Sequence, residues 1–207
     1  MTVRSPWRKL LYEELSGISL DGRILDLGGS RKSDYPKNFV GEFDLVMANL
    51  EVDNENDIKI DLEKPFPIAD STFDGVLCIN VLEHIYNYRN VINETRRILK
   101  TGGTAIFAVP FLVQVHPSPN DHWRFTGDTL ERLFKDAGFE EVRVEAVGTG
   151  VYGAVSQLKF NALHFPILRF ISIKLGFLLD KLLENLFKGE MYTKDFYPLG
   201  YVVYANK

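Results

Sequence analysis

The sequence predicts an α/β fold built on a doubly wound, mostly parallel sheet with helices on both faces. Short apolar runs of strand length alternate with segments whose apolar residues recur at helical spacing. The first apolar run, residues 23–27, leads directly into Gly28 and Gly29. A glycine turn at the carboxyl end of a buried strand allows a ligand to approach the backbone closely. A chain of 207 residues is long enough to form one such domain with a well-buried core.

The first half of the chain predicts one helix and three strands. We expect a helix over residues 6–16, because its apolar side chains recur three or four positions apart and Gly17 follows them. Residues 23–27 and 43–50 are short apolar runs and are expected to form the first two strands. A short third strand is expected over residues 58–61, directly before a proline-rich turn.

The second half continues the alternation. Residues 73–80 are dense in apolar side chains and predict the fourth strand. Residues 88–99 carry apolar side chains along one side and predict a helix, which we expect Gly102 and Gly103 to end. The elements that remain are a helix over residues 128–137 and strands over residues 104–109, 141–147 and 201–205.

Residues 149–195 interrupt this alternation and predict a helical insertion before the last strand, within a single domain of residues 1–207. Residues 166–188 read as one long helix that is apolar over more than half of its circumference, with Pro166 in its first turn. Three interpretations stay open for this helix: a lid or packing helix on the core, a homodimer contact, or a peripheral membrane contact. We expect packing on the core.

Composition narrows the range of partners and compartments. The formal net charge of −4 provides no basic surface, so nucleic acid is not expected as a partner. The single cysteine, Cys78, rules out an internal disulfide and favours a reducing, cytoplasmic location. Its apolar neighbours indicate a core residue rather than a catalytic thiol. The first residues have no apolar stretch like that of a signal peptide, and no uncharged run reaches the roughly 18 residues that a membrane span needs.

Polar residues and glycines follow four successive predicted strands. Because the carboxyl ends of parallel strands meet at one edge of a sheet, where doubly wound folds bind ligands, we expect these residues to lie together. An acid after the second strand is suited to bind the hydroxyls of a ribose. The residues are Asp26, Gly28 and Gly29; Glu51, with Asp53 as a less well placed substitute; Asp61 and Leu62; and Asn80, Glu83 and His84.

Three segments carry a pattern beyond this general arrangement. They are ILDLGGS (24–30), DLEKPFPIADSTFDGVLCINVLEHI (61–85) and NETRRILKTGGTAIFAVP (93–110). In these segments the chain resembles the class I S-adenosylmethionine (SAM)-dependent methyltransferases of the type 11 kind, over about residues 20–148 and 200–206. The resemblance implies a Rossmann-like, seven-stranded sheet whose last strand is antiparallel and inserted beside the fifth.

The resemblance also implies SAM as the cofactor and assigns a place to each residue at the sheet edge. Asp26, Gly28 and Gly29 would lie near the methionyl part, Glu51 at the ribose hydroxyls, Asp61 and Leu62 at the adenine, and Asn80 beside the sulfonium. The chain departs from the family in its first loop, where Ser30 and Arg31 stand in place of further glycines. Either Arg31 pairs with the methionyl carboxylate or it is a solvated loop residue.

Residues 110–126 form a long polar and aromatic loop after the fifth strand, which we expect to bind the acceptor. A hydroxyl acceptor needs a base, for which His116 is the first choice and His84 or Asp121 the next. His116 is otherwise a loop histidine bonded to the backbone. His116, Asp121, Trp123 and Arg124 are the expected substrate-binding residues, and Arg124 either clamps an anionic group or pairs with Asp121. We expect no metal, although His116, Asp121 and His122 are residue types that bind one.

The sequence therefore favours a SAM-dependent methyltransferase that acts on a small molecule or a glycan precursor. The glycan assignment comes from the pattern PFL…H…PxDxxRFT, which resembles a subgroup associated with glycan pathways. One alternative is a non-catalytic cofactor-binding protein or partner subunit. The other is a nicotinamide-dependent oxidoreductase, which the absence of a G-x-G-x-x-G loop disfavours.

Overall fold

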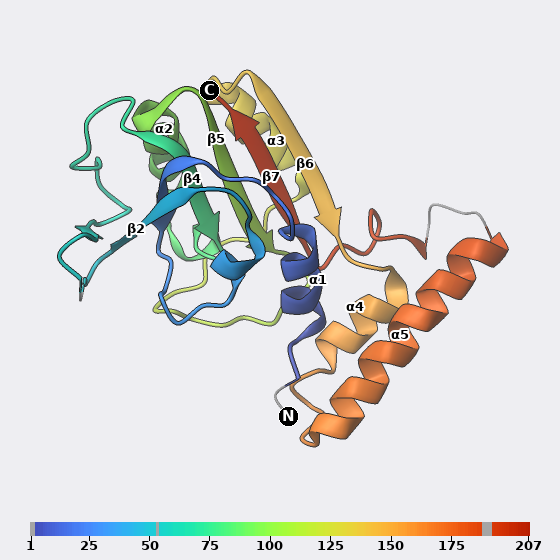
Figure 1. The fold of residues 1–207 in the computed structure, drawn as a ribbon. Helices are drawn as coiled ribbons and strands as arrows, with labels where there is room; N and C mark the ends of the chain where they lie inside the picture. Colours follow the sequence, from blue (N-terminus) through green and yellow to red (C-terminus); the bar gives the residue numbers. More distant parts are fainter. Residues whose placement is uncertain (1–2, 53, 188–191) are drawn as a thin grey trace.

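The computed structural model describes residues 3–52, 54–187 and 192–207, and within them seven strands form one sheet. The strand order is β3-β2-β1-β4-β5-β7-β6. Strands β1 to β5 pair in parallel, whereas β7 is antiparallel to both of its neighbours, β5 and β6. The predicted mostly parallel sheet, with its last strand inserted beside the fifth, is confirmed (Figure 1). The strands are β1 (Gly22–Leu27), β2 (Phe43–Asn49), β3 (Ile58–Lys59), β4 (Phe73–Ile79), β5 (Leu99–Pro110), β6 (Glu141–Val147) and β7 (Gly200–Asn206).

Helices cover both faces of this sheet, as predicted. On one face, α2 (Tyr88–Ile98) and α3 (Gly127–Asp136) pack against the larger cluster of buried apolar side chains. On the other face, α1 (Pro6–Glu14), the 3₁₀ turn η1 (Tyr35–Asn38) and α4 (Val151–Leu158) contribute to a second cluster.

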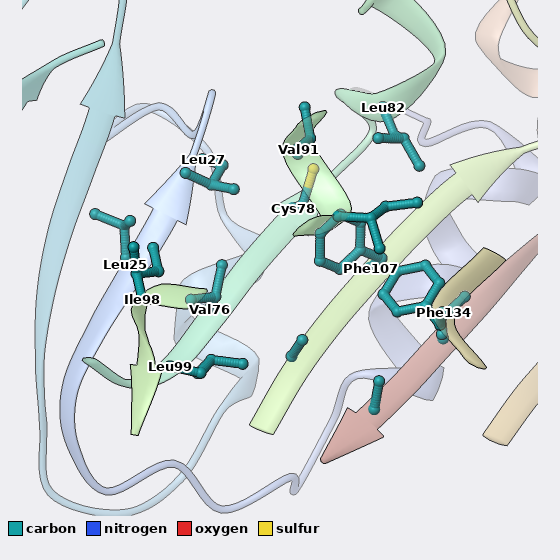
Figure 2. Packing of buried hydrophobic residues seen from close by; sticks show 14 of the residues in the cluster. Leu25, Leu27, Val76, Cys78, Leu82, Val91, Ile98, Leu99, Phe107 and Phe134 are labelled. Carbon is teal, nitrogen blue, oxygen red and sulfur yellow. The ribbon is translucent and has the colours of Figure 1, made fainter. Parts of the chain in front are cut away.

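Figure 2 shows the interior of the first cluster, where Cys78 lies among apolar side chains. The rings of Phe107 and Phe134 pack edge to face beside it, with their centroids 4.9 Å apart. Burial raises the pKa of the Cys78 thiol well above its ordinary value. A neutral, fully buried thiol is a packing residue, as the sequence indicated.

The prediction that Gly102 and Gly103 end a helix is wrong. Helix α2 ends at Ile98, and β5 begins at the next residue, so that both glycines lie inside the strand. The register of β5 against β4 shifts here, and Gly102 adopts the left-handed φ of 77°. A Cβ on Gly103 would lie 2.9 Å from the carbonyl oxygen of Asp74. Both glycines therefore form a β-bulge. In the sequence, glycines at a β-bulge look the same as glycines that end a helix.

Between β6 and β7 the described residues include α4 and the long helix α5 (Pro166–Phe187). The predicted last helical residue, Lys188, lies outside the described residues. Helix α5 packs mainly on α4 and lies at the periphery of the molecule (Figure 1). A Cβ on Gly176 would overlap the Ser156 hydroxyl, so glycine at this position allows the two helices to approach closely. The carboxylate of Asp180 is buried and accepts hydrogen bonds from the backbone N–H groups of Tyr152 and Gly153.

Helix α5 leaves much of its apolar surface exposed. Its exposed apolar residues include Ile167, Ile171, Leu175, Leu178, Leu182 and Leu186. None of the helices in the described parts of the chain is long and apolar enough to cross a bilayer.

Candidate functional site

A cavity of about 970 Å³ opens at the carboxyl ends of the central strands. It lies beside the junction of β1 and β4, where the chain crosses back from β3 to β4 and reverses the direction of strand addition; doubly wound sheets bind ligands at this position. Its walls bring together most of the residues that the sequence singled out, whereas Asp53 lies outside the described residues. The predicted residues on the walls are Gly28, Gly29, Glu51, Asp61, Leu62, Asn80 and His84.

The loop after β1 is held by close packing around its two glycines. Gly28 has a left-handed φ of 69°, and a Cβ there would lie 2.7 Å from the Val81 side chain. A Cβ on Gly29 would overlap the carboxylate of Asp26. From the end of β2, the side-chain amide of Asn49 donates a 2.9 Å hydrogen bond to the carbonyl oxygen of Gly29. Two glycines and one amide thus fix this loop at the cavity wall.

Asp26 does not line the cavity but lies beneath the glycine loop. Its side chain is fully buried, and one carboxylate oxygen accepts a hydrogen bond from the Tyr35 hydroxyl. The other oxygen has no hydrogen-bonding partner among the described residues. Burial raises the pKa of Asp26 to about 7, and the hydrogen bond from Tyr35 opposes this rise. Asp26 therefore supports the loop from below.

The ends of β2 and β3 supply carboxylates to the opposite wall. The side chain of Glu51 is exposed on this wall. The carboxylate of Asp61 forms an ion pair of 2.9 Å with Lys64, and the hydrogen bond from Lys64 lowers the pKa of Asp61. Arg31 also lines the cavity, but its guanidinium binds both carboxylate oxygens of Asp57, at 2.6 and 3.2 Å. Arg31 is thus paired with Asp57, a contact that neither of the two interpretations of Arg31 included.

Asn80 lies at the carboxyl end of β4 with a strained backbone. Its φ is 56°, a left-handed value that few residues other than glycine adopt. Its side-chain oxygen accepts a 2.8 Å hydrogen bond from the indole nitrogen of Trp7, in α1. The side-chain amide of Asn80 is thereby held at the cavity wall by α1, a helix near the N-terminus.

Next to Asn80, two histidines face a buried carboxylate. The Nε2 atoms of His84 and His116 lie 3.7 and 3.8 Å from Oε1 of Glu83, which is fully buried. His84 lines the cavity, and its Nδ1 lies 2.6 Å from the carbonyl oxygen of Asn120. The His116 ring makes an edge-to-face contact with the His84 ring, with their centroids 5.0 Å apart. We call Glu83, His84 and His116 the Glu83 cluster.

The remaining residues of the acceptor loop hold the loop in shape. Arg124 donates to both oxygens of the Asp121 carboxylate, at 2.5 and 2.7 Å, and its hydrogen bond holds the pKa of Asp121 well below its usual range. Asp121 in turn accepts a 2.9 Å hydrogen bond from the backbone N–H of His116. Trp123 packs against Tyr88 and Phe125 and donates from its indole nitrogen to a backbone carbonyl. These contacts give Asp121, Trp123 and Arg124 structural partners.

Sequence reasoning did not identify Trp7, Tyr35 or Asn49 as residues that support the site. Trp7 and Tyr35 are aromatic residues outside the segments that directly follow the predicted strands, and their residue type indicates core positions. Asn49 directly precedes the exposed Leu50 at the end of β2. A polar residue at a strand end is the signal by which Asn49 could have been found.

Comparison with known proteins points to one family. Residues 34–107 match the methyltransferase domain family. An uncharacterized protein of Methanocaldococcus jannaschii is 34% identical over 113 residues, which are 49% of this chain and 49% of that protein. The O-methyltransferase rstn1 of Aspergillus nomiae is 26% identical over 138 residues, 62% of this chain and 55% of that protein. The chain spans about half the length of these curated relatives.

Solved structures share the fold at low sequence identity. A SAM-dependent methyltransferase from Archaeoglobus fulgidus superimposes with a TM-score of 0.58 at 16% identity, over 97% of this chain and 94% of that one. Phosphoethanolamine N-methyltransferase 2 of Haemonchus contortus, in complex with SAM, gives a TM-score of 0.56 at 14% identity, over 97% of this chain and 52% of that one.

Proposed function

From the class I methyltransferase fold of this chain, and the match of residues 34–107 to the methyltransferase domain family, we propose that the protein transfers a methyl group from SAM to a small molecule or a glycan precursor. The single observation that carries this proposal is the cavity at the carboxyl ends of the strands. Its walls combine a tight glycine turn, an exposed acid and an amide in the order in which the family uses them. The activity, substrates and partners of the whole protein are part of this proposal.

We place SAM in this cavity by residue type. The exposed carboxylate of Glu51 accepts hydrogen bonds from the ribose hydroxyls, and Asp61 with the apolar Leu62 faces the adenine. The methionyl part lies on Gly28 and Gly29, where the loop has no side chains to keep it away. Asn80, at the other side of the loop, lies beside the sulfonium.

Methyl transfer is an in-line displacement that depends mainly on alignment. A lone pair of the acceptor forms a bond to the methyl carbon while the carbon–sulfur bond breaks, and its electron pair returns to sulfur to give S-adenosylhomocysteine (SAH). A hydroxyl acceptor must also lose a proton. Asp121 is poorly suited to take it, because Arg124 neutralises this carboxylate and holds its pKa low. We assign the proton to the Glu83 cluster, in which His84 reaches the cavity wall.

Isothermal titration calorimetry tests this proposal. We expect SAM and SAH to bind with a stoichiometry of one, and NAD not to bind. Failure of both sulfur compounds to bind at millimolar concentration would overturn the methyltransferase proposal. Binding of NAD alone would favour the oxidoreductase. Binding of SAH without methyl transfer to any acceptor, glycan precursors included, would favour a cofactor-binding partner subunit.

For the exposed apolar face of α5 we propose one of two partners, a second copy of this chain or a lipid surface, because either would cover apolar side chains that now face solvent. Light scattering at micromolar concentration and flotation with anionic vesicles distinguish them. A monomer that stays with the aqueous fraction would remove both.

A further inference from the structure

The carboxylate of Glu83 is buried without the partners that a buried charge requires. Its exposed fraction is 0%, and neither oxygen has a hydrogen-bonding partner among the described residues. The two nearest imidazole nitrogens, at 3.7 and 3.8 Å, are too distant for hydrogen bonds. Burying an unpaired carboxylate costs several kcal/mol, so such groups are normally paired or bound to a metal.

Both histidines of the Glu83 cluster direct an unprotonated nitrogen toward this carboxylate. Nδ1 of His84 lies 2.6 Å from the carbonyl oxygen of Asn120. Nδ1 of His116 lies 3.0 Å from the carbonyl oxygen of Gln114 and 3.4 Å from a carboxylate oxygen of Asp121. Carbonyl and carboxylate oxygens only accept, so Nδ1 carries the proton in each neutral ring and Nε2 offers its lone pair. One nitrogen of each ring and one Glu83 oxygen lie within 4.8 Å of one another, and Nε2 of each ring lies within 4 Å of that carboxylate.

We propose that Glu83, His84 and His116 bind a divalent first-row transition cation, such as Zn²⁺, through one carboxylate oxygen and two Nε2 atoms. Metal–ligand distances of about 2.1 Å place the ligand atoms of a tetrahedral site about 3.4 Å apart, so each ligand atom moves inward by less than about 1 Å. Two imidazoles and one carboxylate suit a transition cation better than Mg²⁺, which prefers oxygen ligands.

The surroundings of the cluster resemble those of established metal sites. A histidine that binds a metal usually donates its other ring N–H to a carboxylate or a backbone carbonyl, which fixes the tautomer and the ring orientation. Here Asp121 and the Gln114 carbonyl serve His116, and the Asn120 carbonyl serves His84. Arg124 holds the Asp121 carboxylate in place with two hydrogen bonds. The Arg124–Asp121 pair is thereby an outer support of the site.

The ligand set differs from the one that the sequence offered. Of His116, Asp121 and His122, only the first lies in the Glu83 cluster. Asp121 supports His116 from behind, and the ring of His122 packs against Tyr86. Glu83 and His84 enter the set because the 3₁₀ turn η2 (Leu82–His84) brings both side chains to the acceptor loop.

A cation at this position has a role at the acceptor end of the cavity; this part of the inference rests on the proposed function. Three protein ligands leave at least one coordination position for an oxygen of the acceptor. A hydroxyl bound there would have a lowered pKa and would release its proton to water before it attacks the methyl carbon. With the cation bound, the side chains of the Glu83 cluster would serve as its ligands and would no longer take up that proton themselves. We therefore infer an acceptor with a hydroxyl or carboxylate oxygen that binds the metal.

The experiment uses the full chain after treatment with EDTA and removal of the chelator. Zn²⁺ is titrated by calorimetry, and Co²⁺ is followed by its visible absorption, which reports nitrogen and oxygen ligands. We expect one equivalent of each to bind, and Mg²⁺ to bind at least 100-fold more weakly than Zn²⁺. Glu83→Gln and His116→Ala should each weaken Zn²⁺ binding at least tenfold, whereas His164→Ala, at an exposed histidine, should leave it unchanged.

SAH binding in the same samples separates a lost metal site from a lost fold. His116→Ala changes a partly exposed loop side chain, so it keeps the test valid if Glu83→Gln does not fold. Unchanged Zn²⁺ affinity in His116→Ala, or no Zn²⁺ binding by a wild-type chain that binds SAH, would overturn the metal site alone. Zn²⁺ binding without SAH binding would instead overturn the proposed function.

Discussion

The carboxylate of Asp26 lies directly beneath Gly29, so close that a Cβ on Gly29 would overlap it. The glycine at this position therefore serves packing as well as ligand access. A methyl group here forces either the fully buried Asp26 side chain or the loop at the cavity wall to move.

Gly29→Ala should displace the glycine loop and weaken SAH binding at least tenfold, since the cofactor's methionyl part is proposed to lie on this loop. The added methyl group should also destabilise the protein by about 1–3 kcal/mol, the usual cost of overpacking. Calorimetry with SAH and urea unfolding measure the two effects. Ser16→Ala changes an exposed residue that does not line the cavity, and should alter neither. Wild-type SAH affinity in Gly29→Ala would remove the loop from the cofactor site.

Asp26 should make the free energy of unfolding fall as the pH rises. Its pKa is about 7 in the folded protein and 3.8 in the unfolded chain, so the folded state holds the extra proton between these values. The stability that this proton provides is complete below about pH 4 and is lost through about pH 7, with a total on the order of 4 kcal/mol. Urea unfolding at a series of pH values should show this decline, and Asp26→Asn should remove it.

Tyr35→Phe provides the matched variant for that measurement. It deletes the hydrogen bond that lowers the pKa of Asp26, so the decline in stability should extend to higher pH than in the wild type. A decline that ends at the same pH in both proteins would show that Asp26 is not its source.

Glu51→Ala should weaken SAH binding by about 1–3 kcal/mol, the range for a lost polar contact to a buried hydroxyl. The loss of hydrogen bonds to the ribose is the physical reason. Glu55→Ala removes an exposed acid of the same segment that does not line the cavity, and should leave the affinity unchanged. If Glu51→Ala binds SAH normally, the role passes to Asp53.

Arg124→Ala should destabilise the protein by about 1–3 kcal/mol, because the buried Asp121 carboxylate loses its positively charged partner and keeps only the hydrogen bond from the His116 N–H. The double substitution Arg124→Ala with Asp121→Asn should recover part of the lost stability, because Asp121→Asn removes the carboxylate charge that Arg124→Ala leaves without its partner. Thermal unfolding of the wild type and the three variants gives the coupling energy. Additive effects would show that the two side chains do not stabilise each other.

The sheet and the residues at its edge could be predicted because they depend on local patterns. Apolar runs give the strands, and the residues that follow each strand must lie near one another at the edge of a parallel sheet. Glu51, Asp61 and Asn80 all line the cavity for this reason. Asp26, the residue before the last in β1, does not, because successive residues of a strand point to opposite faces and the sequence does not show which face Asp26 takes.

The missed features depend on contacts between distant segments. Helix α4 has Gly150 at its N-cap and Gly153 in its first turn. The carboxylate that binds its first N–H groups comes from Asp180, in a later helix. No side chain within α4 provides a sequence signal for the start of this helix. The Glu83 cluster likewise joins a 3₁₀ turn to a loop more than thirty positions further along the chain.

The hydrogen bond from Trp7 to Asn80 gives the protein an optical reporter of its own cavity. The chain contains only two tryptophans, and the other, Trp123, donates to a backbone carbonyl beside the acceptor loop. Indole emission shifts with the polarity and hydrogen bonding of its surroundings, so a ligand that contacts Asn80 alters the fluorescence of Trp7. Titrations can therefore be read from unlabelled protein, and Trp7→Phe isolates the contribution of Trp123.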